Sequence, residues 1–182
     1  MSPDQVEKIV EKKVQEVMTK NADSRYGESL SVFISHSFDE NDQKLASILQ
    51  KKLKELGINS YLAEKEKRYG YVISNKIKEA IRECYCVVVI LTDHSIISAS
   101  VNQELGYAMG INRNIIPLVK DEVKEKVGVL LKDIEGEEFT VHNFDEKCKV
   151  VSEHISEQQK EIIKSEELPE SGDLFHKERS GF

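Results

Sequence analysis

The chain has 182 residues, of which 39% are hydrophobic and 32% are charged, and its formal net charge is −7. This length suits one domain with a sizeable core, and the sequence has no run of about 18 apolar residues that would predict a membrane-spanning helix. A net negative charge gives no overall attraction to nucleic acid, because phosphate binding relies on clustered lysine and arginine. The first thirty residues are charged throughout and lack the apolar stretch of a signal peptide, so we expect a cytoplasmic protein with neither membrane nor nucleic-acid partners.

The cysteine content argues against disulfides and metal centres. Cys84, Cys86 and Cys148 are too few and too unevenly spaced for a disulfide framework or a four-ligand zinc site. We therefore expect reduced thiols packed in or near the core, and we predict no metal site.

Residues 4–20 predict an amphipathic helix. Val6, Val10 and other apolar residues recur there at helical spacing, and Asp4 lies in the first turn, where a carboxylate suits the helix dipole. Residues 21–29 follow as a polar linker. The helix either docks on the following domain or pairs with another copy of the chain, and both interpretations are open.

From Leu30 onward, strand patterns alternate with helix patterns. The first half predicts a strand over residues 30–35, a helix over 41–57, a short strand over 58–63, a charged loop over 64–71, a helix over 72–84 and a strand over 86–92. Gly57 is well suited to end the first of these helices. The strand at 86–92, CVVVILT, is almost wholly apolar, as expected of a parallel strand that is covered on both faces.

The second half continues the alternation. It predicts a helical region within 93–110, a strand over 115–119, a helix over 124–133, a strand over 138–144 and a helix from Asp145 into the 150s or 160s. The charged stretch that follows contains a proline and two glycines and predicts a loosely ordered tail. The expected organisation is an amino-terminal helix and linker at 1–29, one folded domain at 30–165 and a tail at 166–182.

Alternating strands and helices indicate an α/β fold with a parallel sheet between two helical layers. Five strands predict a flavodoxin-like three-layer sandwich with strand order 2-1-3-4-5. In such sheets, ligands bind beyond the carboxyl ends of the strands where the winding reverses, here between the first and third strands. The segments expected at this rim are Ser35 to Ser37, the loop 64–71, and the region that contains Ser98 and Glu104.

Several common enzyme motifs are missing from the sequence. It contains no GxxxxGK[ST] phosphate loop, no GxGxxG after a strand, no HExxH and no GxSxG. These absences argue against ATP hydrolysis, redox use of NAD+, metalloproteolysis and serine esterase chemistry. Ser35 beside His36 does not form a nucleophile and base, because adjacent residues in a strand point to opposite faces.

The segments VFISHSFDENDQKLASILQKKLKELGINSYLAE, a loop with Gly70, ISNKIKEAIRECYCVVVILTDHSIISASVNQELGYA, and IIPLV occur in this order between Leu30 and Phe144. Together they resemble a Toll/interleukin-1 receptor (TIR) domain of the prokaryotic kind. The resemblance is closest at SVNQELGYA, which is similar to the family's catalytic helix.

The resemblance implies the same flavodoxin-like fold and an activity found in many prokaryotic members. They cleave the bond between nicotinamide and ribose in NAD+, which gives nicotinamide plus ADP-ribose, a cyclic isomer or a conjugate that acts as a signal, often in immunity. Glu104 occupies the position of the family's catalytic glutamate, and residues 64–71 correspond to the BB loop, which shapes the site and mediates TIR–TIR packing. NAD+ is then the substrate, no cofactor is expected, and the expected protein partner is another copy of the chain in a homo-oligomer.

One carboxylate is sufficient for this chemistry in principle. Breaking the N-glycosidic bond develops positive charge on the ribose, which a nearby carboxylate stabilises while it holds the ribose hydroxyls. Nicotinamide leaves as a neutral base, so no general acid is needed. A site closed to water favours attack by a group of the substrate itself, and an open site favours hydrolysis.

Candidate substrate-binding residues come from the first strand and the BB loop. Phe33 is either an aromatic contact or a core residue, with the core role favoured, and Ser35, His36 and Ser37 either contact phosphate or ribose or cap the strand end. In the loop, Lys65 and Arg68 attract the pyrophosphate or are simply solvated, and Tyr71 stacks on a base or braces the loop.

The helix that carries Glu104 adds three further candidates. Ser98 is expected to cap this helix and thereby fix the carboxylate. Many active members have tryptophan four residues before the glutamate, where this chain has Ser100, and the chain contains no tryptophan. Tyr107 lies one helical turn beyond Glu104 and is the candidate substitute for that aromatic wall, together with Tyr71, Phe38 or a neighbouring subunit.

Three hypotheses for function remain open. The first is an NAD+-consuming hydrolase or cyclase, and the second is a TIR interaction module that assembles without chemistry, which the missing tryptophan favours. The third is a relative that acts on free nucleosides, such as a deoxyribosyltransferase. Consumption of NAD+ separates the first from the other two.

Overall fold

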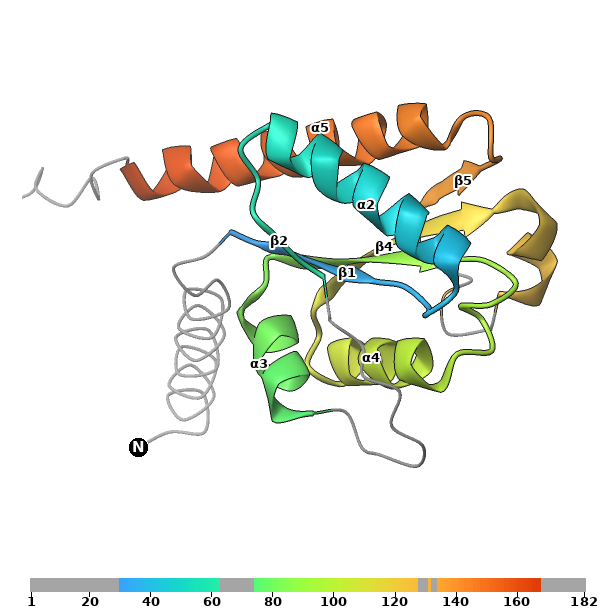
Figure 1. Cartoon of the computed structure of the whole chain (residues 1–182). Helices are drawn as coiled ribbons and strands as arrows, with labels where there is room; N and C mark the ends of the chain where they lie inside the picture. The colour runs from blue at the N-terminus through green and yellow to red at the C-terminus, as the bar shows by residue number, and fades with distance from the viewer. Residues whose placement is uncertain (1–29, 63–73, 128–130, 132–133, 168–182) are drawn as a thin grey trace, which may run out of the picture.

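The computed structural model describes residues 30–62, 74–127, 131 and 134–167, which form a parallel sheet between two layers of helices (Figure 1). The strands are β1 (Val32–Ser35), β2 (Ser60–Leu62), β3 (Cys86–Leu91), β4 (Asn114–Lys120) and β5 (Glu137–Phe139), and the helical elements are α2 (Glu40–Glu55), α3 (Asn75–Glu83), α4 (Ala99–Gly110), the 3-10 helix η1 (Asp121–Lys126) and α5 (Phe144–Glu167). The strand order is β2-β1-β3-β4-β5 and every described pairing is parallel. The predicted flavodoxin-like α/β fold is therefore confirmed.

Local sequence signals set the ends of α2. The Asp39 side chain accepts a hydrogen bond from the backbone N–H of Asn41 and caps the helix, and acidic residues occupy its first turn. Gly57 follows the last turn with a φ of +74°, a left-handed conformation that glycine adopts without strain. The predicted end of this helix is thus confirmed.

The helices divide into two pairs that cover opposite faces of the sheet. Figure 1 shows α2 and α5 on one face and α3 and α4 on the other. Alternate residues of each strand serve the two faces: Val32 and Ile34 join the cluster under α2 and α5, whereas Phe33 joins the cluster under α3 and α4. Every residue of β3 is buried, which confirms the expectation of a central strand that is covered on both sides.

Two predicted elements in the second half differ in the structure. The helix expected over residues 124–133 is replaced, where the chain is described, by the 3-10 helix η1, which ends at Lys126 and is followed by Val127 in an extended backbone conformation. Gly128 follows immediately, and a glycine weakens an α-helix at this point. The strand expected over 138–144 is only the short β5, because the chain turns between Thr140 and Asn143, which are hydrogen-bonded to each other, before α5 begins at Phe144.

The last helix anchors the amino end of the sheet. The side-chain amide of Gln159 donates a hydrogen bond to the backbone carbonyl of Leu30 at 2.7 Å, and the Tyr85 hydroxyl donates one to Gln158 at 2.9 Å. On the outer surface, Lys52 of α2 forms a 3.0 Å ion pair with Asp145 of α5. These contacts hold α5 against the sheet and α2. The candidate site lies at the opposite edge, where the strands end.

Some expectations concern residues outside the described ranges. They are the amino-terminal helix over 4–20 with its linker, the BB loop over 64–71, and the tail. Among the described helices, none combines the length and apolar character needed to traverse a bilayer. All three cysteines are buried free thiols, as predicted.

Candidate active site

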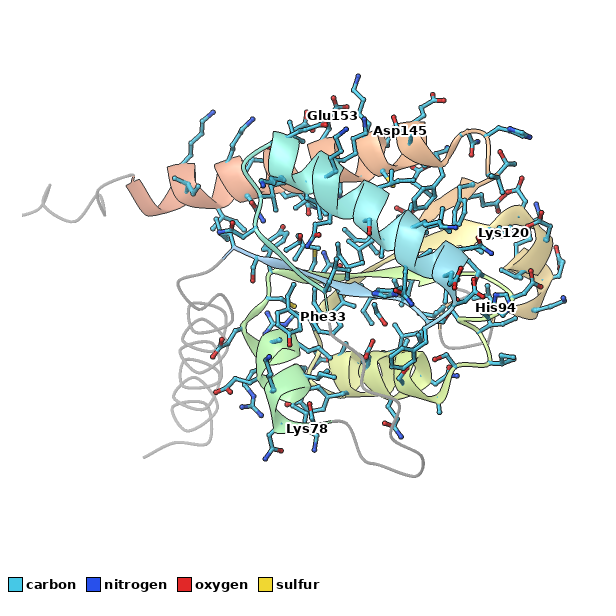
Figure 2. All side chains as sticks on the ribbon, in the orientation of Figure 1. Phe33, Lys78, His94, Lys120, Asp145 and Glu153 are labelled. Atoms are coloured by element: carbon cyan, nitrogen blue, oxygen red, sulfur yellow. The ribbon has the colours of Figure 1, made fainter. Side chains whose placement is uncertain are left out.

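The carboxyl ends of β1 and β3 lie side by side at the point where the winding of the sheet reverses. From β1 the chain passes through α2 to β2 on one side, and β3 then begins the half that runs outward to β5. Ligands of doubly wound sheets bind at such a point. His94 follows β3, and Lys120 is the last residue of β4. Figure 2 shows both residues at this same end of the molecule.

Ser35 and Glu104 meet at this point. The hydroxyl of Ser35, the last residue of β1, donates a 2.5 Å hydrogen bond to Oε2 of Glu104 on α4. Ser35 is 0% exposed and Glu104 is 1% exposed. Ser35 points toward α4 because it lies two residues after Phe33, whose side chain packs on the same face of the sheet.

Helical periodicity explains how α4 presents Glu104. The buried residues of this helix are Val101, Glu104, Leu105 and Ala108, which form one stripe against the sheet. Glu104 is therefore the charged member of an otherwise apolar stripe. The Ser98 side chain accepts a hydrogen bond from the backbone N–H of Val101, so the predicted cap of this helix is confirmed.

A second buried carboxylate, Asp42, connects the ends of the two central strands. Asp42 is 1% exposed, and its Oδ2 accepts hydrogen bonds from the Ser37 hydroxyl, which follows β1, and from the Thr92 hydroxyl at 2.8 Å, which follows β3. The Ser37 oxygen also accepts from the backbone N–H of Asp39 at 3.1 Å. This network fixes both loops at the rim.

Asp42 is not among the site residues predicted from the sequence, although the sequence carries a signal for it. Asp42 precedes Ala46, Leu49 and Leu53 at helical spacing, so it continues the buried stripe of α2. A carboxylate at a buried position of a helix needs a hydrogen-bond or charge partner inside the fold. The partner Thr92 could not be identified from the sequence, because it lies 50 residues away.

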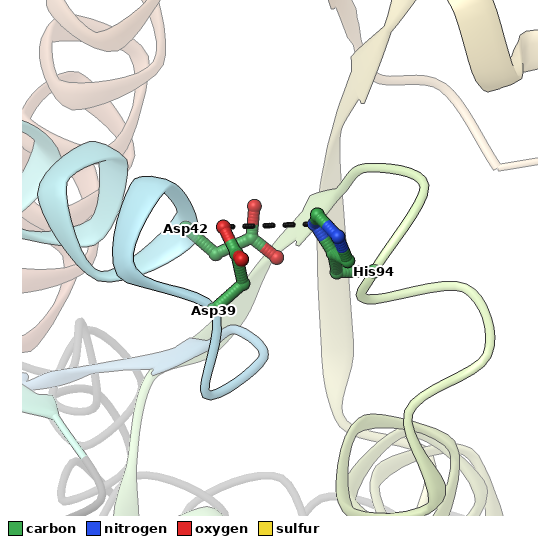
Figure 3. A group of neighbouring side chains, drawn as sticks. All are labelled: Asp39, Asp42 and His94. Carbon is green, nitrogen blue, oxygen red and sulfur yellow. Dashed lines mark ion pairs between the residues drawn. The ribbon is translucent and has the colours of Figure 1, made fainter.

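Within the described ranges, Asp39, Asp42 and His94 have potential metal-binding atoms within 4.8 Å of one another (Figure 3). Each of these side chains already has a structural contact. Asp39 caps α2 and lies 3.5 Å from Nδ1 of His94, and Asp42 accepts the two hydroxyl bonds of Ser37 and Thr92. Helix capping and ion pairing account for this cluster, so we assign it no cation.

Lysines balance part of the negative charge at the rim. Lys120 lies 2.9 Å from Glu122 and 3.9 Å from Asp93, and Lys126 lies 3.5 Å from Asp93. The hydrogen bond to Glu122 raises the pKa of Lys120, and the nearby Asp93 and Asp42 act in the same direction while burial opposes them. The rim therefore presents charges of both signs.

The other predicted site residues of the first strand lie in the interior. Phe33 is fully buried and stacks on Tyr61 with 5.6 Å between ring centroids, so the core role weighed for it is the observed one. His36 is 7% exposed and its Nδ1 lies 2.7 Å from the backbone carbonyl of Ser37. Ser37 is bound to Asp42 as described above.

The remaining candidates divide between α4 and the BB loop. The Ser100 hydroxyl is 3.0 Å from that of Ser98 at the start of α4. Tyr107 is directed toward α3, where its hydroxyl accepts a 2.9 Å hydrogen bond from Arg82 and the Lys78 ammonium lies 5.9 Å from its ring centre. Lys65, Arg68 and Tyr71 lie outside the described residues.

A comparison with family models decides the family. The model described as "TIR domain" matches residues 32–150, which include Ser35, Asp42 and Glu104. The chain belongs to the TIR domain family. The TIR assignment from the sequence is thus confirmed, and the match gives no evidence that the chain is of the prokaryotic NAD+-cleaving kind.

Solved TIR structures share the fold. The TIR domain of the Toll-related receptor TRR-2 from Hydra magnipapillata matches with a TM-score of 0.53 and 17% identity, over 68% of this chain and 96% of that one. A metazoan TIR-STING receptor from C. gigas, solved in complex with 2',3'-cGAMP, matches with a TM-score of 0.52 and 21% identity over 66% of this chain. The match spans 39% of that receptor chain, and at these identities the likeness concerns the fold alone.

A comparison with individually curated proteins found no significant match. The TIR family contains NAD+-cleaving enzymes, and TIR domains self-associate in oligomers. Family membership alone therefore leaves catalysis and self-association as questions for this particular chain.

Proposed function

We propose that this TIR domain is an NAD+ glycohydrolase or cyclase that cleaves the bond between nicotinamide and ribose. The observation that carries the proposal is the position of Glu104. Its carboxylate lies at the reversal point of the sheet, on a helix capped by Ser98, and it is held by the Ser35 hydroxyl. The prokaryotic immune or signalling role, in the cytoplasm, that the sequence resemblance implies is part of the same proposal.

In this mechanism, Glu104 acts as the electrostatic partner of the reacting ribose. Its carboxylate accepts hydrogen bonds from the ribose hydroxyls and stabilises the positive charge that develops as the bond to nicotinamide lengthens. The low polarity around Glu104, whose neighbours on the helix are Val101, Leu105 and Ala108, strengthens that interaction. Water or a group of the substrate then attacks C1 of the ribose, which gives a linear or a cyclic product.

The burial of Glu104 sets a condition on this activity. Because Glu104 is 1% exposed, substrate contact requires a rearrangement that uncovers its carboxylate. We propose that assembly of several copies supplies this change, since TIR domains self-associate. The activity should therefore rise more steeply than in proportion to protein concentration.

An interaction module without chemistry is the second candidate. Ser100 stands where many active members have tryptophan, and Tyr107, the candidate substitute, is engaged by Arg82 and Lys78 of α3. Together with the burial of Glu104, these two observations favour a protein that assembles but leaves NAD+ intact. Such a module would self-associate and release no nicotinamide from NAD+.

The test is chromatography with mass detection of NAD+ incubated with concentrated wild-type protein and, in parallel, with Glu104→Ala. We expect nicotinamide from the wild type at a rate at least about 100-fold above the variant, because removal of one electrostatic stabiliser typically costs a factor of about 100 to 1,000. The mass of the second product distinguishes hydrolysis from cyclisation. If both proteins assemble and neither releases nicotinamide, the interaction module replaces the enzyme.

A further inference from the structure

The hydrogen bond between Ser35 and Glu104 joins two elements that are far apart in the chain. The residues are separated by 69 positions, and the bond from the Ser35 hydroxyl to Glu104 Oε2 is 2.5 Å long. A hydroxyl that donates to a carboxylate makes one of the stronger hydrogen bonds in proteins, and burial strengthens it further. This contact therefore links β1 to α4 at the centre of the candidate site.

Ser35 is mounted on the more rigid of the two elements. It ends β1, which is paired with β2 on one side and β3 on the other, and Ser35 itself is in register with Val89. Both Ser35 and Val89 are 0% exposed. Glu104, in contrast, reaches its carboxylate through three rotatable bonds, so the carboxylate needs an external contact to hold one orientation.

We infer that Ser35 is a positioning residue that holds the carboxylate of Glu104 in the orientation needed to act on the substrate. The inference rests on the proposed function, and it assigns Ser35 a different role from the contact with phosphate or ribose considered in the sequence analysis. The Ser35 hydroxyl donates its one proton to Glu104, so we assign it to the carboxylate, and the rearrangement that uncovers Glu104 has to keep this bond.

Two consequences distinguish positioning from substrate contact. Loss of the hydroxyl should lower kcat and leave KM nearly unchanged, because the binding surface for substrate is intact. It should also move the acid limb of the kcat profile to higher pH, since the lost hydrogen bond favours the ionised carboxylate that the reaction uses. A purely structural role would move neither quantity in the folded protein.

The matched control is another buried serine. Ser152 of α5 is also 0% exposed, and its hydroxyl has no hydrogen-bond partner among the described residues. Ser35→Ala and Ser152→Ala therefore remove the same atom from equally buried positions, and only the first removes a contact with Glu104. Ser35→Thr keeps a hydroxyl and serves as the conservative variant.

The experiment measures NAD+ turnover against pH for the wild type and these three variants. We expect Ser35→Ala to lose roughly 10- to 100-fold in kcat, the scale of a misplaced catalytic group, with KM within about twofold. Its acid limb should move up by about one pH unit, consistent with the loss of one hydrogen bond to a charged group. Ser152→Ala should match the wild type, and Ser35→Thr should recover part of the loss. A rise in KM at unchanged kcat, or equal behaviour of Ser35→Ala and Ser152→Ala, would overturn the inference.

A second readout does not depend on turnover. The carbon-13 resonance of the Glu104 side-chain carboxyl, assigned by comparison with Glu104→Gln, can be followed against pH in the wild type and in Ser35→Ala. We expect its midpoint to move upward in Ser35→Ala and to stay in place in Ser152→Ala. If the wild type does not cleave NAD+, the proposed function fails. An upward shift of the Glu104 midpoint in Ser35→Ala would even then show that Ser35 stabilises the ionised carboxylate of Glu104. If the Glu104 midpoint is the same in Ser35→Ala as in the wild type, the inference about Ser35 is wrong whether or not the protein is an enzyme.

Discussion

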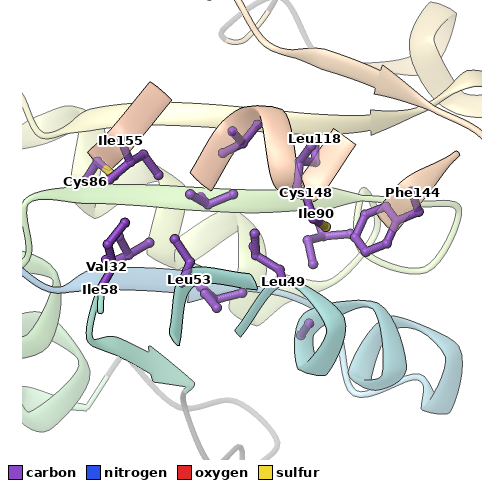
Figure 4. Packing of buried hydrophobic residues seen from close by; sticks show 14 of the residues in the cluster. Val32, Leu49, Leu53, Ile58, Cys86, Ile90, Leu118, Phe144, Cys148 and Ile155 are labelled. Atoms are coloured by element: carbon purple, nitrogen blue, oxygen red, sulfur yellow. The ribbon is translucent and has the colours of Figure 1, made fainter. Parts of the chain in front are cut away.

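The two faces of the sheet treat buried side chains differently. Under α2 and α5, Figure 4 shows a cluster of apolar side chains in which leucine, isoleucine, valine, phenylalanine and cysteine side chains fill the space. Under α3 and α4, the cluster is also largely apolar, but Ser35 and Glu104 are buried beside it and bonded to each other. The α2 and α5 face also buries polar side chains, among them Asp42 and Ser152, but Asp42 binds the loops that follow β1 and β3 through Ser37 and Thr92.

Burial of a carboxylate costs free energy that an apolar side chain at the same position would not cost. The hydrogen bond from Ser35 offsets part of that cost. A leucine in place of Glu104, on the stripe of Val101, Leu105 and Ala108, would fill the space with no such cost. Positions that break a local rule of folding are often functional. Glu104 breaks this rule where we propose the chemistry, whereas Asp42, the buried carboxylate of α2, fixes the loops that follow β1 and β3.

The largest expected effect on stability comes from truncating the apolar face. Leu49 is 0% exposed within that cluster, so Leu49→Ala should lower the free energy of unfolding by about 2–5 kcal/mol. Leu56→Ala removes the same atoms from a side chain that is 43% exposed, and it should cost less than about 1 kcal/mol. Chemical denaturation measures both, and NAD+ turnover in the folded proteins should be unaffected. A fall in kcat for folded Leu49→Ala would show that the apolar cluster under α2 and α5 also affects the candidate site.

Two glycines, one just before β5 and one on α4, are expected to affect stability in opposite directions when replaced by alanine. A Cβ at Gly136, just before β5, would lie 2.3 Å from the Pro117 carbonyl oxygen of β4, so Gly136→Ala should cost about 1–3 kcal/mol. A Cβ at Gly106, on the exposed side of α4, would meet nothing within 4 Å, and Gly106→Ala should stabilise the protein by about 0.5–1 kcal/mol. Thermal unfolding of the two variants should therefore shift in opposite directions. Equal shifts would show that the approach of the two strands is looser than described.

The thiols give the smallest effect and come from both faces. Burial raises the pKa of Cys84 to about 11 and that of Cys148 to about 12, and it raises the pKa of Cys86 as well, from an ordinary value of 9.0. Because the folded state keeps these thiols protonated, the stability that they contribute is full below pH 9 and is lost as pH rises through about 11 to 12.

We therefore expect the free energy of unfolding to fall with increasing pH above about 9, and a thiol reagent at pH 8 to react only after denaturation. Cys86→Val should reduce the alkaline loss of stability, because it removes the thiol whose ionisation burial opposes most strongly. Rapid labelling of the native protein would contradict the described burial of the thiols.

The fold could be predicted from the sequence because its signals are local. The apolar strand CVVVILT, the helical stripe of α2 that ends at Gly57, and the Ser98 cap each depend on neighbouring residues. The helix expected over 124–133 differs where the chain is described, because the 3-10 helix η1 occupies Asp121–Lys126 and Val127 is extended. The apolar spacing favoured a helix there, but Gly128 within the expected span lowers helix propensity.

The site could be predicted only in part, because its contacts join distant segments. Glu104 was found through the resemblance of SVNQELGYA to a catalytic helix, and Ser35 was placed at the rim by strand order. The bond between them, and the Asp42 network with Ser37 and Thr92, exist only once β1, β3 and α4 are packed together. Such partners carry no spacing signal in the sequence.

Whether Glu104 is catalytic can be decided from the rate of nicotinamide release by Glu104→Gln beside the wild type, with both proteins concentrated enough to assemble. Glutamine has nearly the shape of glutamate and its amide oxygen can accept the Ser35 hydrogen bond, so the fold and its stability should be retained. We expect release to fall by at least about 100-fold while the unfolding midpoint does not decrease. Equal release by the two folded proteins would contradict a catalytic role for Glu104.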